Sequence, residues 1–241
     1  MLRLLLTCEH GGNLIPAAYA PLFQGHEEVL TTHQGYDIGA LDLYNSLKPM
    51  ADVGFYSETS RLLVELNRSQ HHARLFSAYT QVLPPAEKAR LLEKHYKPYR
   101  EQVEQMVSDF VSAGRCVLHV AVHTFTPELD GEERQADVGL LYDPKRKHEQ
   151  DFSRKWKAAL NKADKNLLVR FNYPYLGIAD GFPTYLRRKF TEDEYVGIEL
   201  EVNQKYPQQG GARWQELQTL LARTLQEVVN CKGAMFSKNT I

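Results

Sequence analysis

Cysteine is scarce in this sequence of 241 residues. The three cysteines, Cys8, Cys116 and Cys231, are far apart and form no C-x-x-C pair. This spacing argues against a disulfide scaffold and against a zinc site built from thiolates. If the chain binds a metal, its ligands must therefore be histidines or carboxylates.

Long apolar runs are also missing, since no stretch approaches the roughly 18 apolar residues that a membrane helix needs. Arg3 interrupts the apolar start, and polar residues follow too early for a signal peptide. The 29 basic residues nearly balance the 30 acidic ones, and the net charge of −1 creates no field for nucleic acid or an anionic membrane. We expect a soluble, cytoplasmic protein that binds neither nucleic acid nor membrane.

The motifs of the common nucleotide-binding and serine-hydrolase folds are absent too. The sequence contains no G-x-G-x-x-G, no Walker A motif and no G-x-S-x-G. It also has no repeat, low-complexity tract or linker. Its length and apolar content suit a globular domain with a full core, so we expect residues 1–241 to form a single domain. A homo-oligomer is compatible with this pattern.

Short apolar runs alternate with amphipathic stretches along the whole chain. This alternation predicts an α/β sandwich with a largely parallel or mixed sheet, a class in which ligands bind beyond the carboxyl ends of strands. Helices are expected from near Asp37, after Pro84-Pro85 as far as Phe110 with a kink at Pro98, over Glu149–Lys162, and over about 212–230. The predicted strands are Leu2–Thr7, Val53–Ser57, Leu62–Leu66, Cys116–His123, Val138–Tyr142, Leu167–Phe171 and Tyr195–Val202.

Two of these strands end in histidine. His10 follows the first strand within Glu-His-Gly-Gly-Asn, and His123 ends the strand of "HVAVH". Neutral imidazole is the commonest protein ligand of zinc, and catalytic zinc usually takes three protein ligands. A lone histidine at a strand end is more often a hydrogen-bonded structural residue, but two of them with Glu199 bring the two interpretations to about even. His119 lies in mid-strand and is interpreted as a hydrogen-bonded core residue.

Asp37 is the candidate for the third ligand, because a carboxylate could complete the set. Aspartate is equally suited to cap a helix, and Asp37 stands where a helix is expected to begin. Both interpretations stay open from the sequence.

Glu199 lies in the strand "GIELEVN", on the same face as Glu201. An unpaired carboxylate on a buried strand is costly, and a general base beside a metal would explain its presence. The competing interpretation is an ion pair with Arg187, Arg188 or Arg68.

An arginine stands at each end of the run "RLLVELNR". Arg61 and Arg68 could each form a bidentate contact with a carboxylate of a small acidic substrate. The stretch "IADGFPTYLRR" predicts a loop with a turn at Asp180, followed by Arg187; such loops commonly contact substrates. Solvated surface charges are the alternative for these arginines.

Five stretches in chain order, "TCEHGGNLIP", "HQGYDIGALDL", "SRLLVELNRS", "HTFTP" and "GIELEVN", resemble the N-formylglutamate amidohydrolase family. The similarity extends from about Arg3 to the last helix. It implies a hydrolase of linear amide bonds that acts on a small N-acyl amino acid.

The motif order is also distantly similar to that of zinc carboxypeptidases and aspartoacylases. The resemblance implies that His10 and His123 are metal ligands, that Asn67 and Arg68 bind and orient substrate carboxylates, and that Glu199 is the catalytic base. Asn13 stands where those enzymes have a liganding glutamate, so the third ligand is Asp37 or Asn13; we prefer Asp37 and assign Asn13 to substrate binding. The implied fold is a three-layer α/β sandwich around a mixed eight-stranded sheet, of the phosphorylase/hydrolase or zinc exopeptidase type.

The sequence thus predicts a metal-dependent amidohydrolase with one divalent ion, expected to be zinc, that cleaves an N-formyl amino acid such as N-formylglutamate through a metal-activated water. Arg68, helped by Arg61, Asp180 or Arg187, would hold the substrate. The alternatives are a carboxypeptidase- or aspartoacylase-like hydrolase of another amide, and a non-catalytic small-acid binding protein on the same fold.

Overall fold

The apolar runs assemble into a mixed six-stranded sheet with the strand order β2-β1-β3-β8-β6-β7. The computed structural model describes residues 1–232, with side chains up to residue 230. The pairs β1–β2, β1–β3, β3–β8 and β6–β7 are parallel, and β6 is antiparallel to β8. The strands are β1 (Leu2–Cys8), β2 (Val53–Tyr56), β3 (Cys116–Phe125), β4 (Glu128–Leu129), β5 (Glu132–Glu133), β6 (Val138–Leu141), β7 (Val169–Phe171) and β8 (Tyr195–Asn203).

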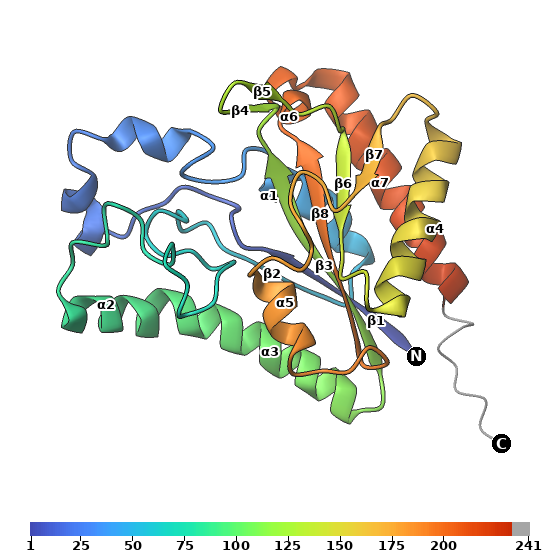
Figure 1. The fold of residues 1–241 in the computed structure, drawn as a ribbon, viewed down its shortest axis with the longest axis horizontal. Helices are drawn as coiled ribbons and strands as arrows, with labels where there is room; N and C mark the ends of the chain where they lie inside the picture. The colour runs from blue at the N-terminus through green and yellow to red at the C-terminus, as the bar shows by residue number, and fades with distance from the viewer. Residues whose placement is uncertain (233–241) are drawn as a thin grey trace.

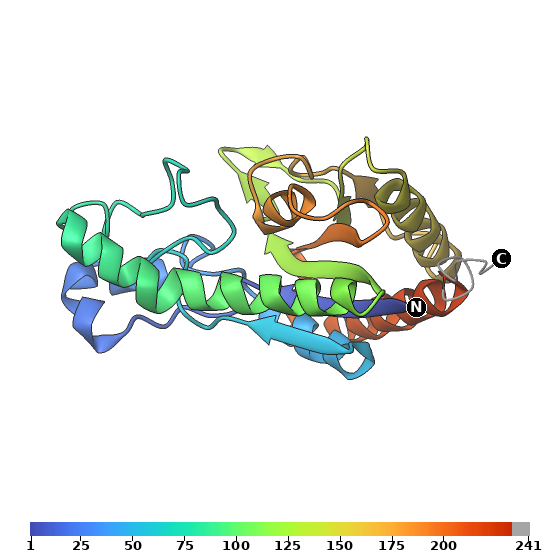
Figure 2. The ribbon, with the colours of Figure 1, turned by 90° about the horizontal axis from the view of Figure 1, so that it is seen from below.

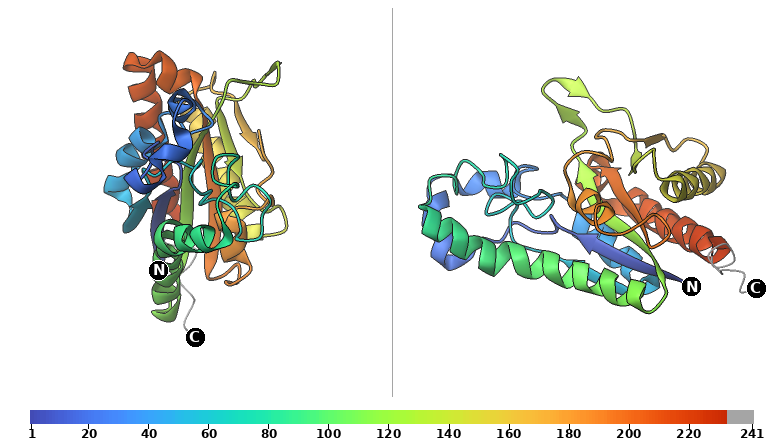
Figure 3. Two further views of the ribbon diagram at one scale, coloured as in Figure 1. Left: turned by 90° about the vertical axis from the view of Figure 1, so that its left-hand side faces the viewer. Right: turned by 60° about the horizontal axis from the view of Figure 1, so that its bottom comes forward.

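The α/β fold with a central mixed sheet is confirmed, whereas the expectation of eight strands in that sheet is wrong. Within residues 1–232 six strands form it, and β4 and β5 pair only with each other. Their two-residue strands are exposed and form a hairpin that projects from the carboxyl end of β3 (Figure 3).

Helices cover both faces of the sheet. One face packs on α1, α4 and α7 through residues such as Leu43, Trp156 and Leu221, all fully buried. The other packs on α3 and α5 through Val103 and Phe182; Figure 1 shows α5 in front of the sheet and α1 behind it. The α-helices are α1 (Ala40–Leu47), α2 (Pro85–Leu91), α3 (Lys97–Ser112), α4 (Lys147–Ala163), α5 (Phe182–Arg187), α6 (Lys205–Gln209) and α7 (Gly211–Lys232). None of the helices within residues 1–232 has the length and hydropathy that crossing a membrane requires.

The predicted kink near Pro98 takes the form of a π-helical turn, Leu92–Tyr96, between α2 and α3. Proline lacks the N–H that an α-helix would donate to the preceding turn, and π-turns within α-helices are one recognised site of local bending. The helical course therefore continues past the edge of the sheet (Figure 2). Segments 13–36 and 57–84 lie beside it, and they contain the 3₁₀ turns Ala17–Phe23 and Glu27–Thr31.

The predicted strand Leu62–Leu66 is wrong. This stretch forms consecutive turns, in which Leu63 N–H donates to Ser60 O and Glu65 N–H donates to Leu75 O. Leu63, Val64 and Leu66 of this stretch are buried in a separate apolar cluster with Leu91 and Tyr96 of the long helical course. An apolar run without alternation signals burial but does not by itself specify a strand.

His119 is a core residue, as expected. It is fully buried in β3, with Nε2 2.7 Å from Thr7 Oγ1 and Nδ1 2.6 Å from Tyr195 Oη. Burial lowers the pKa of His119 from 6.5 to about 4. Between these two pH values the unfolded chain binds a proton that the folded chain does not.

We therefore predict that the free energy of unfolding falls as the pH is lowered from 6.5 to 4, with His119 contributing up to about 1.4 kcal/mol per pH unit. Replacing His119 by Gln should remove this contribution. Urea unfolding of both proteins across the window measures the difference. Parallel curves for the two proteins would contradict the buried, neutral state of His119.

Candidate active site

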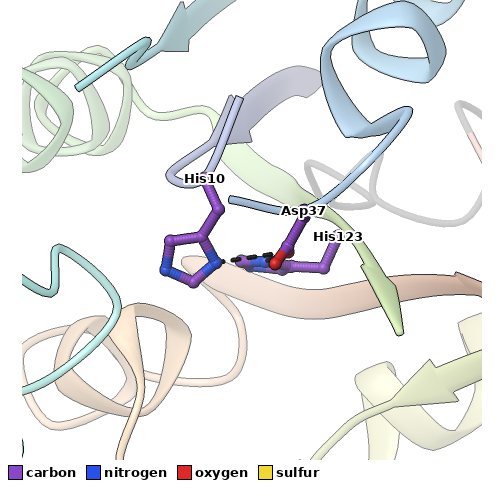
Figure 4. Close-up of side chains that lie close together, drawn as sticks. All are labelled: His10, Asp37 and His123. Atoms are coloured by element: carbon purple, nitrogen blue, oxygen red, sulfur yellow. Dashed lines mark hydrogen bonds and ion pairs between the residues drawn. The ribbon is translucent and has the colours of Figure 1, made fainter. Parts of the chain in front are cut away.

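Three side chains from separate parts of the chain meet at the carboxyl ends of β1 and β3. His10 follows β1, His123 lies in β3, and Asp37 lies in the segment before α1. Asp37 Oδ2 is 3.2 Å from His10 Nδ1 and 2.9 Å from His123 Nδ1. All three side chains are buried, and one nitrogen or oxygen of each lies within 4.8 Å of the others (Figure 4).

Asp37 reaches this position because its backbone is fixed to the end of β1. Its N–H donates to His10 O at 3.0 Å. It does not cap α1: Gly39 is the N-cap residue, with a φ of 82° that favours glycine, and no side chain caps that helix. Burial would raise the pKa of the Asp37 carboxyl, but His10, His123 and Arg61 hold it well below its usual value.

The glycines after His10 allow a close approach of backbone to backbone. A Cβ atom at Gly12 would lie 2.6 Å from Glu58 O, and Leu14 N–H donates to the same carbonyl at 2.9 Å. The chain that follows His10 is thereby held against the extension of β2. The glycines in the opening motif serve this contact.

At each imidazole, the ring nitrogen that does not face Asp37 lies next to another buried carboxylate. His10 Nε2 is 2.5 Å from Glu65 Oε1, and His123 Nε2 is 3.2 Å from Glu9 Oε2. Tyr99 donates its hydroxyl to Glu9 Oε1 at 3.1 Å. Burial opposes ionisation of Glu9, but His123 outweighs it and lowers the pKa of Glu9 to about 2.

This arrangement fits a divalent metal ion. Histidines that bind metals usually have a carboxylate or carbonyl at the other ring nitrogen, which fixes the ring and its tautomer. Here the Nδ1 atoms of both rings face Asp37, and the Nε2 atoms of both face carboxylates. Two imidazoles and one carboxylate are also a ligand set found in catalytic zinc sites.

Glu199 and Glu201 lie beside this group on the neighbouring strand. Glu201 is in register with His123 across the β3–β8 pair, and Glu199 is in register with Ala121. Neither carboxylate has an ion-pair partner within residues 1–230, so the ion pair considered for Glu199 does not form. Burial raises the pKa of Glu199, and it raises the pKa of Glu201 to about 8.

The loops around Asn67 and Asp180 are tied together next to Glu199. Asn67 Oδ1 accepts from Phe182 N–H at 2.6 Å, and Asp180 Oδ2 accepts from Ser69 N–H at 2.8 Å. Arg68 Nη1 donates to the carbonyls of Asn67 and Asp180 at 2.8 and 3.0 Å. A Cβ atom at Gly181 would lie 3.0 Å from Glu199 Oε1, so this junction borders the carboxylate directly.

Comparison with known proteins shows to which family this fold and its buried histidines and carboxylates belong. The family model of N-formylglutamate amidohydrolase matches residues 2–206. The chain belongs to the N-formylglutamate amidohydrolase family. The family resemblance inferred from the five sequence stretches is thus confirmed. None of the curated proteins compared with the chain matches it.

Solved structures agree with the N-formylglutamate amidohydrolase family at the level of the fold. The gene product Atu2144 of Agrobacterium tumefaciens is similar with a TM-score of 0.79 and 24% identity, over 95% of this chain and 91% of that chain. An N-formylglutamate amidohydrolase of Ralstonia eutropha JMP134 is similar with a TM-score of 0.69 and 16% identity, over 97% and 95%. A metallo-carboxypeptidase of Burkholderia cenocepacia gives only 0.40 at 12% identity, over 98% of this chain and 58% of that chain.

Two arginines expected to hold substrate in this family member are engaged by protein groups. Arg187 is buried and donates to Glu149 Oε1 at 2.9 Å and to the carbonyls of Gly177 and Gly197 at 2.6 and 2.9 Å. Arg61 donates to Asp37 and Glu65. Asn13 is half-buried on the turn after His10 and forms no hydrogen bond or ion pair with the residues that the structure describes. Among the described residues, the guanidinium of Arg68 donates only to backbone carbonyls.

Sequence reasoning missed Glu9 and Glu65, the carboxylates behind the two imidazoles. Glu65 stands inside the apolar run "LLVELN", and Glu9 directly follows β1. The cost of burying a carboxylate, which singled out Glu199, applies equally to both. That signal was present, but their partners are set by the tertiary structure.

We predict that His10 and His123 retain one divalent ion per chain. The variants His10→Ala and His123→Ala should each lose most of the metal, because each removes one ligand. Elemental analysis of protein purified without chelator measures this, with His119→Gln as a control at a histidine outside the site. Stoichiometric metal in a His10→Ala, His123→Ala double variant would contradict the assignment.

Proposed function

We propose that this chain is a metal-dependent amidohydrolase that removes the acyl group of a small N-acyl amino acid, such as the formyl group of N-formylglutamate. The observation that supports this best is the convergence of His10 Nδ1, His123 Nδ1 and Asp37 Oδ2 next to the buried carboxylates of β8. Membership of the N-formylglutamate amidohydrolase family supports the substrate class.

His10, Asp37 and His123 would hold the ion, which we expect to be zinc. A divalent ion bound there supplies a Lewis acid that polarises an amide carbonyl and lowers the pKa of water to about 7. The carboxylates of Glu65 and Glu9 keep the two imidazole rings in place for this purpose. Proton transfer and binding of the substrate carboxylate would be carried out by side chains of the protein.

Glu199 is proposed as the general base. It accepts a proton from the attacking water and passes that proton to the nitrogen of the leaving amino acid. Its carboxylate lies at the border of the Asn67 and Asp180 junction, with no ion pair to a residue of the described chain. Burial raises the pKa of Glu199 and so makes it a better proton acceptor than an exposed glutamate.

Arg68 is proposed to bind the substrate carboxylate. Among the described residues its guanidinium donates only through Nη1, to two backbone carbonyls. Its other nitrogens are therefore available for a carboxylate, and Asn67 and Asp180 fix the loop that presents them. A substrate held there would have its amide directed toward Glu199.

The base assignment predicts that Glu199→Gln keeps the fold and the metal while lowering kcat by about 10²–10⁴, which is the usual contribution of general base catalysis. Glu201→Gln is the matched control, because it changes the same side chain two residues along the same face of β8. Steady-state hydrolysis of N-formylglutamate and metal analysis of both variants give the answer. If Glu201→Gln shows the large loss and Glu199→Gln does not, the base is Glu201.

The clamp assignment predicts that Arg68→Lys raises KM for N-formylglutamate by roughly 10- to 100-fold, because lysine keeps the charge but loses the planar fork. The melting temperature should change little. A substrate amide without the free carboxylate should react poorly with the wild type and respond little to the substitution. Equal weakening of both substrates, or a fall mainly in melting temperature, would show that Arg68 holds the fold.

A further inference from the structure

We infer that Arg61 is a positioning residue of the metal site: together with Glu65 it fixes the rotation of the Asp37 carboxylate and the ring nitrogen that His10 presents to the ion. This inference rests on the proposed function, since it concerns the same metal site. It replaces the substrate-binding role that the sequence suggested for Arg61. Four observations support it.

The first observation is that all three guanidinium nitrogens of Arg61 are used by two buried carboxylates. Nη1 donates to Asp37 Oδ1 at 3.0 Å, while Nε and Nη2 donate to Glu65 Oε2 at 2.8 and 2.5 Å. The side chain of Arg61 is 26% exposed, whereas those of Asp37 and Glu65 are 5% and 9% exposed. Three of the five N–H donors of Arg61 are thus bound to carboxylates of the protein, which hold the guanidinium against Asp37 and Glu65.

The second observation concerns Asp37. Because Arg61 holds Oδ1, only Oδ2 turns toward His10 Nδ1 and His123 Nδ1. Without Arg61, the carboxylate could rotate about its Cβ–Cγ bond and turn both oxygens, or neither, toward the imidazoles. Arg61 therefore fixes the rotation of the Asp37 carboxylate, with a single oxygen facing the two Nδ1 atoms.

The third observation concerns His10. Arg61 binds Glu65 Oε2, and the other oxygen, Glu65 Oε1, lies 2.5 Å from His10 Nε2 and accepts from Asn67 N–H at 2.9 Å. An acceptor at Nε2 favours the tautomer with its hydrogen on Nε2, which leaves the Nδ1 lone pair for a metal. Arg61 thus acts on His10 through Glu65.

The fourth observation is that the backbone brings the two carboxylates within reach of one arginine. Arg61 N–H donates to Gly35 O at 3.2 Å, and the Ser60 hydroxyl donates to the same carbonyl at 2.8 Å. These bonds fasten the turn that begins at Arg61 to the segment that ends at Asp37. Within that turn, Arg61 and Glu65 are four residues apart and face the same side.

The charge of Arg61 and its hydrogen bonds predict opposite changes in metal affinity when Arg61 is replaced. Removing its positive charge from beside a cation site would strengthen metal binding by electrostatics alone. Removing its hydrogen bonds would weaken binding, because the groups behind metal ligands commonly contribute 10- to 100-fold in affinity. Arg61→Lys keeps the charge and loses the fork, and Arg61→Met loses both, so the pair separates the two effects.

The test measures Zn²⁺ affinity by competition with a chromophoric chelator. Arg61→Lys and Arg61→Met should both bind Zn²⁺ about 10- to 100-fold more weakly than the wild type. Arg3→Lys is the matched control, since Arg3 pairs with Asp52 at 2.5 Å at the opposite end of β1. Arg3→Lys should leave the affinity unchanged. Wild-type affinity in Arg61→Lys, or tighter binding by Arg61→Met, would overturn the positioning role.

Two further measurements distinguish positioning from mere folding. In Zn²⁺-loaded protein labelled with ¹⁵N-histidine, the Nε2–H resonance of His10 should be visible in the wild type and lost or exchange-broadened in Arg61→Lys at unchanged melting temperature. Glu65→Gln should weaken Zn²⁺ binding as Arg61→Lys does, and the double variant should lose less than the product of the two fold-changes, because the two residues act as one unit. If the double variant loses the full product of the two fold-changes in Zn²⁺ affinity, the two residues act independently, and the coupling is overturned.

The result also separates this inference from the proposed function. Assayed at saturating Zn²⁺, Arg61→Lys should retain the KM for N-formylglutamate, whereas Arg68→Lys should not. A raised KM in Arg61→Lys at unchanged Zn²⁺ affinity would make Arg61 a substrate clamp and overturn the inference alone. A wild-type protein that binds no Zn²⁺ would instead contradict the proposed function itself.

Discussion

The shared oxygen of Asp37 is the contact on which the rest of the site depends. Oδ2 of this carboxylate lies next to His10 Nδ1 and His123 Nδ1, and so joins the ends of two neighbouring strands to the segment before α1. Each partner then brings another buried group: His10 faces Glu65, His123 faces Glu9, and Asp37 Oδ1 is bound by Arg61.

The charge of this region is a second reason for proposing a cation there. Within residues 1–230, Arg61 is the guanidinium that pairs with the carboxylates around the two imidazoles. Burying several carboxylates in one region is costly, and the proposed divalent ion would offset part of that cost. The buried carboxylates of the region are Glu9, Asp37, Glu65, Glu199 and Glu201.

The sequence predicted the parts of the site that lie on the sheet. The apolar runs before His10 and His123, and the strand that contains Glu199, were recognisable from local sequence, and the ends of parallel strands meet at one edge. The run from Leu62 to Leu66 was misassigned because its apolar residues lack the alternation that separates a strand from a buried turn. The pairing of Arg61 with Glu65 depended on that turn and was missed with it.

The ion-pair partners of the arginines were also not predictable from the sequence. Arg187 lies near Asp180 in sequence, but its partner Glu149 lies in α4, 38 residues earlier, and no local pattern links the two. The substrate contacts proposed for Asn67 and Arg68 lie on loops, while the proposed metal ligands His10 and His123 lie at strand ends. In the proposed function, strand ends would therefore supply two of the three metal ligands, and segments 57–84 and 172–181 would recognise the substrate.

The central claim is that Nδ1 of His10, Nδ1 of His123 and Asp37 Oδ2 bind one ion. The most direct measurement is an anomalous difference map from a crystal grown with Zn²⁺, recorded on both sides of the zinc absorption edge. The account predicts a single peak at about 2.0–2.2 Å from these three atoms, with the Nε2 atoms still facing Glu65 and Glu9. A map without a peak at this position, or with the ion bound through the Nε2 atoms, would contradict it.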